Sequence, residues 1–182
     1  RLKNDIRTTF PDKSTVVRYD MARTKLPYLI AVLYESMRLH PAVAGYMPRY
    51  VPEQGAHLMN GKYFLPPGTE IGVPIFSCNR NKETWSNRNE FDPERFMGPG
   101  SEERFKDVLT FSSGVRMCAG IHFSMAEMCV ALANLILRYD LKLPDGMENC
   151  FKSVGEIPGK SYFNYGPTDP DKECWMIISP VE

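Results

Sequence analysis

One cysteine stands in a glycine-flanked loop that runs directly into a long apolar segment, and this arrangement constrains the chain more than any other feature. The loop covers residues 111–120 and contains Cys118. The apolar segment from Ile121 to Tyr139 is predicted to be a helix that begins just past the cysteine. A helix N-terminus and a nearby cation, here Arg116, both favour the ionised thiolate, which is the form that binds metals. The loop therefore predicts that Cys118 offers a single thiolate to a metal or a cofactor.

Two glycines frame this cysteine. Gly114 and Gly120 relieve crowding where the backbone turns or where a flat ligand approaches it closely. The pattern alone leaves a second interpretation open, because a lone cysteine at a helix start is more often a buried structural residue. Two further motifs decide between these interpretations.

A charged pair lies inside a second predicted helix, between Pro27 and Pro41. Pro27 suits the first helical turn, and Pro41 ends the helix. Glu35 and Arg38 are three residues apart, so they share one helix face and can pair. Because most of the neighbouring side chains are apolar, the pair is expected to be buried and to need further partners, rather than to be a solvated surface pair.

These motifs, and the order in which they occur, resemble those of the cytochrome P-450 family. The haem loop of that family is matched by Phe111, Gly114, Arg116, Cys118 and Gly120. The family's Glu-x-x-Arg helix is matched by Glu35 and Arg38, and the arginine of a later loop is matched by Arg95, within residues 91–96. The resemblance covers nearly the whole chain and has features typical of eukaryotic, and in particular fungal, members.

The resemblance implies a haem b cofactor. Cys118 is then the proximal ligand of the iron, and thiolate ligation favours cleavage of the O–O bond of bound oxygen. The other matched residues of the loop, Phe111, Gly114, Arg116 and Gly120, are expected to hold the cofactor. None of the matched residues is predicted to be a catalytic acid or base.

The resemblance also implies roles for arginines outside the loop. It joins Glu35, Arg38 and Arg95 in one network that locks the region beneath the haem. Arg49 follows the helix that contains Glu35. Arg49 and Arg116 are each expected to pair with a haem propionate, because a guanidinium binds a carboxylate bidentately.

The implied fold is mainly α-helical with small β-sheets, the C-terminal, haem-ligating part of the cytochrome P-450 fold. Residues 1–182 are expected to form the C-terminal portion of a single domain, because the chain opens on Arg1 in what is predicted to be a helix already under way. The helices of the distal wall, with the acid and alcohol that deliver protons to bound oxygen, are expected to lie outside this chain.

The implied function is that of a haem-thiolate monooxygenase, which uses dioxygen and electrons from a reductase to oxidise a lipophilic organic substrate. Two alternatives stay open. One is a truncated product that binds haem weakly or not at all and catalyses nothing, and the other is isomerase or dehydratase chemistry on the same cofactor. The complete protein is expected at the endoplasmic reticulum membrane, anchored by an N-terminal helix outside this chain.

Composition narrows the possible classes of protein. Basic and acidic residues number 22 each and are interspersed, so there is no electrostatic case for binding nucleic acid. The five cysteines contain no C-x-x-C pattern, which argues against zinc fingers and iron–sulfur clusters. Cys129, within the apolar helix, is expected to be a core residue. Glu127 and Asn134 in the same helix favour a buried core helix over a membrane span.

Turn signals predict the remaining elements. An Asn-Gly turn predicts a hairpin over residues 57–64, and a strand is expected over residues 69–76. Residues 79–106 are expected to form a long irregular loop with a short helix near residues 83–86. A further strand is expected at residues 175–179.

Two segments bear on the substrate. Residues 42–45 are small and apolar, and they follow the helix of Glu35, where the resemblance implies that the family lines its pocket. They suggest room for a bulky lipophilic molecule, but such residues suit a tight turn equally well. Residues 149–171 match no pattern of the family, so no substrate contact is assigned to them.

Overall fold

The computed structural model describes residues 1–145, 159–161, 165–167 and 175–181. Within these ranges the α-helices are α1 (Leu2–Thr9), α2 (Tyr19–Lys25), α3 (Pro27–Leu39), α4 (Ile75–Cys78), α5 (Ser101–Asp107) and α6 (Ile121–Arg138). The strands pair antiparallel, two by two: β1 (Arg49–Tyr50) with β4 (Glu70–Ile71), β2 (Ala56–Leu58) with β3 (Tyr63–Leu65), β5 (Tyr139–Lys142) with β8 (Ile177–Pro180), and β6 (Gly159–Ser161) with β7 (Tyr165–Pro167). The predicted fold class, mainly α with small β-sheets, is confirmed.

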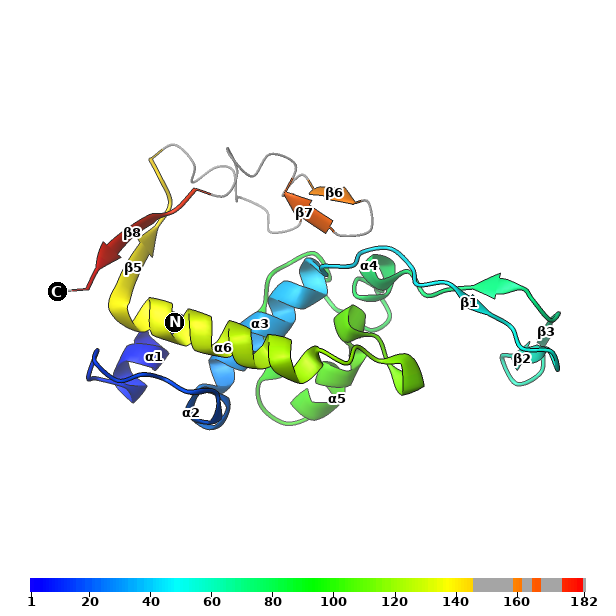
Figure 1. The fold of residues 1–182 in the computed structure, drawn as a ribbon, viewed down its shortest axis with the longest axis horizontal. Helices are drawn as coiled ribbons and strands as arrows, with labels where there is room; N and C mark the ends of the chain where they lie inside the picture. The colour runs from blue at the N-terminus through cyan, green and yellow to red at the C-terminus, as the bar shows by residue number, and fades with distance from the viewer. Residues whose placement is uncertain (146–158, 162–164, 168–174, 182) are drawn as a thin grey trace.

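The main core forms where α6 packs against α1, α2 and α3 (Figure 1). The buried side chains of α6 are Met125, Cys129, Ala133 and Leu137. They recur every fourth residue, so they form one stripe along the helix and meet the apolar residues of the other three helices. The predicted helix and the predicted core position of Cys129 are both confirmed.

Polar groups tie α6 to the N-terminal segment. The Asn134 side chain donates from Nδ2 to the Val17 carbonyl at 2.8 Å and accepts from the Val17 N–H at 3.0 Å.

By length and composition α6 is also apolar enough to cross a membrane, with a mean hydropathy of 1.3. The stripe packs into the core, as expected of a core helix, whereas Phe123 on another face is 73% exposed.

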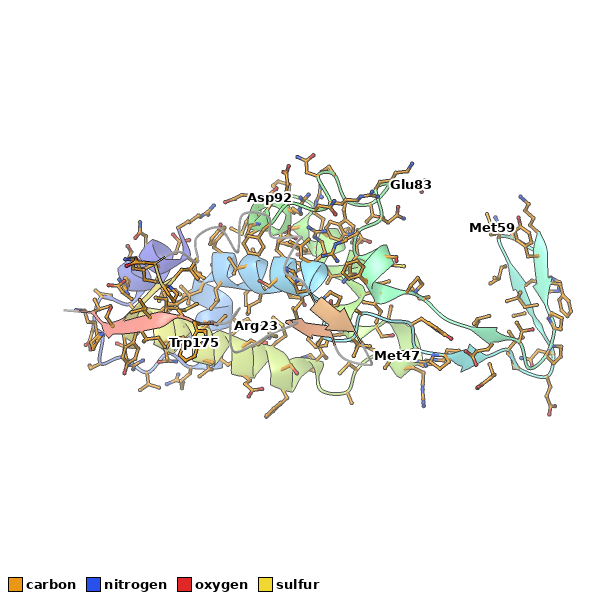
Figure 2. The ribbon with its side chains drawn as sticks, turned by 90° about the horizontal axis from the view of Figure 1, so that it is seen from above. Arg23, Met47, Met59, Glu83, Asp92 and Trp175 are labelled. Carbon is orange, nitrogen blue, oxygen red and sulfur yellow. The ribbon has the colours of Figure 1, made fainter. Side chains whose placement is uncertain are left out.

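The predicted hairpin is confirmed and projects away from the helices. Ala56 pairs with Leu65 and Leu58 with Tyr63, which leaves a four-residue loop over residues 59–62. The loop turns through positive φ angles, 55° at Asn60 and 87° at Gly61, a conformation that these two residue types tolerate well. Figure 2 shows Met59 at the tip of the hairpin, at the opposite end of the molecule from Trp175.

The strand predicted over residues 69–76 is wrong beyond Ile71. β4 contains only Glu70–Ile71, and the helical turn α4 starts at Ile75. Pro74 has no N–H to donate to a strand ladder, and it sits directly before the first turn of α4. The chain therefore leaves the sheet early and turns back toward α3.

The short helix predicted near residues 83–86 is also wrong. That segment contains only turns, and regular structure comes later, as the 3₁₀ helix η1 (Pro93–Phe96) and as α5. Asp92 caps η1 by accepting a hydrogen bond from the Glu94 N–H at 3.1 Å. The first turn of α5 carries two glutamates, which the helix dipole favours there.

The C-terminal strand predicted at residues 175–179 is found slightly later, as β8, where it pairs with β5. Residues 149–171 lie outside the described residues except for the short strands β6 and β7.

Candidate functional site

Glu35 and Arg38 form a fully buried ion pair on α3. Nε of Arg38 donates to Oε2 of Glu35 at 2.7 Å, and Nη2 donates to Oε1 at 2.8 Å. Both side chains are 0% exposed. Arg95, from η1, adds a third charge by donating from Nε to Oε1 of Glu35 at 3.1 Å. The structure thus brings the three residues of the predicted network together around one carboxylate.

Two guanidinium groups on one carboxylate leave an excess positive charge, and backbone carbonyls balance it. Arg38 donates at 2.8–3.1 Å to three of them, the carbonyls of Asn79, Arg88 and Glu90. Arg95 donates at 2.6 and 3.0 Å to two more in the same loop, those of Ser86 and Asn87. Four of these five carbonyls belong to residues 86–90, so the bonds hold that part of the loop against α3 and η1. The arginines therefore determine the shape of this loop.

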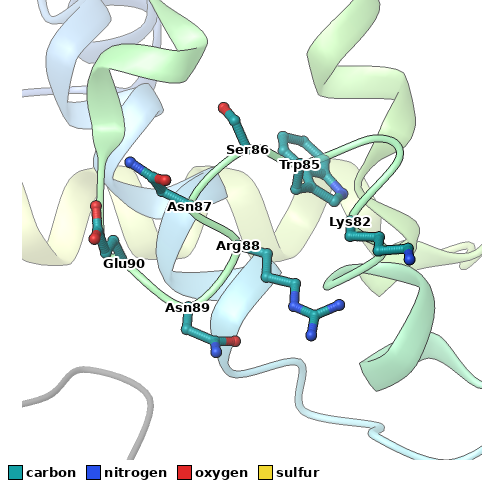
Figure 3. A pocket seen from close by; sticks show the side chains of 7 residues that line it. All are labelled: Lys82, Trp85, Ser86, Asn87, Arg88, Asn89 and Glu90. Carbon is teal, nitrogen blue, oxygen red and sulfur yellow. The ribbon is translucent and has the colours of Figure 1, made fainter.

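The captured loop also covers the network. Trp85 is 1% exposed, and the guanidinium carbon of Arg38 lies 5.2 Å from the centre of its ring. Figure 3 shows the polar side chains around Trp85 fanning outward from the loop. They line a shallow pocket of about 380 Å³ that includes Lys82 and Arg88, well separated in the chain from Cys118.

The cysteine loop is built from two 3₁₀ turns, η2 (Leu109–Phe111) and η3 (Gly114–Arg116). The Cys118 N–H donates to the Phe111 carbonyl at 2.9 Å, which closes the loop on itself. Gly114 has a φ of 77°, and Ser112 has a φ of 61° with a ψ of −168°. Glycine adopts such angles freely, but serine does so only under strain.

Cys118 is exposed, whereas Cys129 on α6 is completely buried. Burial raises the pKa of the Cys129 thiol to about 11, so this thiol stays protonated and unreactive at neutral pH. A Cβ added at Gly120 would lie 3.7 Å from the Sγ of Cys118, in van der Waals contact with the sulfur. Glycine at position 120 therefore leaves that side of the sulfur open.

A cavity of about 650 Å³ lies between this loop and the β1–β4 sheet. Its lining includes Arg49 and Val73 on one side and Gly114, Val115 and Arg116 on the other. The structure therefore brings the two arginines proposed as propionate partners to a single cavity with mostly apolar walls. The described part of the lining does not include Phe111, Cys118 or Gly120, which lie elsewhere in the same loop.

Residues 42–45, predicted to leave room for a substrate, do not belong to the described lining of this cavity. Ala44 is 8% exposed, and its carbonyl accepts the Phe76 N–H at 3.0 Å. This segment serves as a turn that holds α4, because its backbone supplies the acceptors for the first N–H groups of that helix.

Sequence reasoning missed one residue of this region. Asn79 is 0% exposed and lies between the buried network and the cysteine loop. In the sequence it stands in a polar segment rich in Asn and Arg, where nothing distinguishes a buried asparagine from a solvated one.

Comparison with known proteins agrees with this geometry. A protein-family model described as Cytochrome P450 matches residues 1–160. A crystal structure of a cytochrome P450 superposes with a TM-score of 0.74 at 22% sequence identity, covering 92% of this chain and 36% of that chain, which shows a common fold.

Curated relatives come from fungi and plants. The cytochrome P450 monooxygenase helB2 of Aspergillus fumigatus is 32% identical over 97% of this chain and 35% of its own length. The cytochrome P450 monooxygenase macH of Penicillium terrestre is 36% identical over 84% of this chain and 30% of its own length. The 3-hydroxyindolin-2-one monooxygenase of Zea mays is 35% identical over 81% of this chain and 28% of its own length.

The chain spans about a third of the length of these relatives. Nearly all of it matches the family model, and its helices superpose on a solved member of the family. Glu35, Arg38 and Arg95 meet in one buried network, and Asn79 links that network to the loop of Cys118. This chain belongs to the cytochrome P450 family.

Proposed function

We propose that the whole protein is a haem-thiolate monooxygenase that oxidises a lipophilic organic substrate, and that this chain supplies the thiolate ligand of its haem b. The observation that carries the proposal is the cavity that joins Arg49 and Arg116 beside the loop of Cys118. The fungal and plant relatives named as monooxygenases support the reaction class.

The residues present fit a haem group. Its two propionates need cations, and two arginines reach the same cavity. Its flat ring needs apolar walls and close approach to the backbone, which Val73, Val115 and Gly114 offer. A Cβ added at Gly114 would meet nothing within 4 Å, so only the missing side chain keeps that space clear. The iron would need a sulfur ligand, and Cys118 is an exposed thiol on this loop.

Each residue then has a task of its own. Cys118 presents Sγ as the iron ligand, while its N–H remains bonded to the Phe111 carbonyl and holds the loop closed. Arg49 and Arg116 bind carboxylates at the cavity and set the orientation of the ring. The apolar walls exclude water, and the network of Glu35, Arg38 and Arg95 holds the loop and the helices behind it. When bound, the haem supplies oxygen activation, using dioxygen and electrons from a reductase.

We also propose that the whole protein lies at the endoplasmic reticulum membrane. The sequence resembles eukaryotic members of the family, and these are commonly anchored there. Cell fractionation of the whole protein, followed by carbonate extraction, tests this placement. Recovery in the soluble fraction would contradict it.

The assignment of Cys118 is tested by spectroscopy on the whole protein. The ferrous carbon monoxide complex is expected to show the red-shifted absorption of a thiolate ligand. Cys118→Ala should abolish that absorption, whereas Cys129→Ala should keep it, because the buried Cys129 lies away from the loop. An unchanged spectrum in Cys118→Ala would refute the assignment of Cys118 as the iron ligand.

A second readout does not depend on activity. In the haem-free protein the exposed Cys118 is expected to react with iodoacetamide, and added hemin should protect it. Mass spectrometry of the tryptic peptides measures the protection. Equal alkylation of Cys118 with and without bound hemin would also refute the assignment.

A further inference from the structure

Asn79 joins the buried network to the base of the cysteine loop. Its side chain accepts the Leu109 N–H at Oδ1, at 2.9 Å, and donates from Nδ2 to Oγ1 of Thr110 at 3.2 Å. Its backbone carbonyl accepts Nη1 of Arg38 at 3.0 Å. One residue that is 0% exposed thus contacts both parts of the site, the loop through its side chain and the network through its backbone carbonyl.

The direction of each hydrogen bond is determined by its partners. A backbone N–H only donates, so the atom of Asn79 that faces Leu109 must be the oxygen, and the nitrogen faces Thr110. The Thr110 hydroxyl donates to the Met37 carbonyl at 2.8 Å, which only accepts. The single hydrogen of the hydroxyl is used in that bond, so the hydroxyl oxygen must accept from Nδ2 of Asn79. Asparagine suits this position because one short side chain carries both a donor and an acceptor.

These bonds reach the cysteine through a short path. Leu109 and Thr110 belong to η2, and the next residue, Phe111, accepts the Cys118 N–H through its carbonyl at 2.9 Å. Leu109 also lines the 650 Å³ cavity. A shift of η2 therefore moves both the backbone of Cys118 and one wall of the cavity.

We propose that Asn79 and Thr110 are positioning residues that hold η2 on α3 and thereby set where Cys118 presents its sulfur to the iron. The inference rests on the proposed function, since it assumes that Cys118 is the ligand. Neither residue touches the cofactor in this account. They act through Phe111, whose carbonyl fixes the backbone of Cys118.

The test compares variants of the haem-loaded whole protein that differ in one hydroxyl group. Thr110→Ser keeps the hydroxyl, whereas Thr110→Val removes it and keeps the volume. Thr110→Ala removes the hydroxyl without setting a methyl group against the Met37 carbonyl, so it serves if the valine variant does not fold. The readout is the ratio of the carbon monoxide complex without a thiolate ligand to the complex with one, measured on folded protein.

Removing the hydroxyl is expected to raise this ratio roughly ten-fold, because it strands two buried polar groups that hold η2. Asn79→Asp, which cannot donate to Thr110, should raise it as well, and Thr110→Ser should leave it unchanged. Val17→Ala lowers stability in the core away from the loop, and it should also leave the ratio unchanged.

Three results would overturn the inference. One is an unchanged ratio in both Thr110→Val and Thr110→Ala, and another is a rise in Val17→Ala equal to theirs, which would indicate a general loss of stability. The third is the absence of a thiolate spectrum in the unmodified protein. That result would refute the proposed function as well, so the unmodified protein separates the two failures.

Discussion

The buried network on α3 and the exposed loop of Cys118 contrast in how their charges are satisfied. Glu35 and Arg38 are 0% exposed, and they share partners from three segments of the chain. Residues 113–119 of the loop are all exposed, and Val115 is fully so. The network is thus complete within the chain, whereas the loop presents its sulfur and its arginine outward.

The contrast separates a structural role from a binding role. A buried ion pair must be satisfied by the protein itself, because its desolvation cost is offset only by good geometry and further hydrogen bonds. A ligand loop must keep its donor accessible until the cofactor arrives. The network therefore bears on folding, and the loop bears on cofactor binding.

The largest effect is expected from breaking the network. Glu35→Ala leaves two arginines buried without their carboxylate, and it should cost about 3–5 kcal/mol of unfolding free energy. Glu103→Ala removes an exposed partner of Lys106 and should change the unfolding free energy very little. Urea unfolding of both variants measures the difference. A soluble, fully haem-loaded Glu35→Ala protein with an unchanged midpoint would contradict the role of the network.

A smaller effect is expected at the cavity. Arg116→Gln removes one cation from its lining and should weaken hemin binding about 10- to 100-fold, since hydrogen bonds to charged groups are worth about 1.5–3 kcal/mol. Its unfolding free energy should stay nearly unchanged, because Arg116 is exposed. Arg104→Gln on α5, outside the cavity, is the control. Hemin titration that gives equal affinities for the two variants would remove Arg116 from the site.

Relief of strain in the loop should be measurable on its own. Ser112→Gly is expected to raise the unfolding free energy by about 1 kcal/mol, because glycine adopts the positive φ of 61° without strain. Ser113→Gly lies one residue later in extended backbone, with φ of −149°, and should lower stability instead. Thermal unfolding compares the two, and the same sign in both variants would show that Ser112 is not strained.

The effect that is smallest at neutral pH concerns Cys129, because it develops only at alkaline pH. Burial raises the pKa of Cys129 to about 11 from its ordinary value of 9.0. Its protonated thiol therefore contributes stability that is fully present below pH 9 and is lost as pH rises toward 11, because the unfolded thiol ionises first. Unfolding free energies of the protein and of Cys129→Ala should converge over that range. A difference that is constant from pH 8 to pH 11 would show that the thiol is not desolvated.

The sequence predicted the elements whose signals are local. α3 lies between two prolines, α6 is a long apolar run, and the hairpin follows an Asn-Gly turn, and each was found at or near its predicted bounds. Spacing on a helix also predicted that Glu35 and Arg38 can pair, since residues three apart share a face. The order of the motifs around Cys118 indicated the family without any coordinates.

Tertiary contacts decided the rest. Residues 83–86 contain only turns, and Arg38 from α3 and Arg95 from η1 hold the stretch that follows them by binding its carbonyls. Residues 69–76 do not form one strand, because the chain turns at Pro74. The N–H groups of Ile75 and Phe76 then donate to carbonyls of residues 44–45, in the segment before β1.

The sequence by itself determined which residues are able to bind a metal, to pair charges and to form helices, because these properties belong to single residues and to short spacings. Only the tertiary structure decided that Arg49 and Arg116 reach one cavity and that Asn79 joins α3 to the cysteine loop. Such contacts join residues that are 30 or more positions apart in the chain. They depend on how whole helices pack, which no local pattern records.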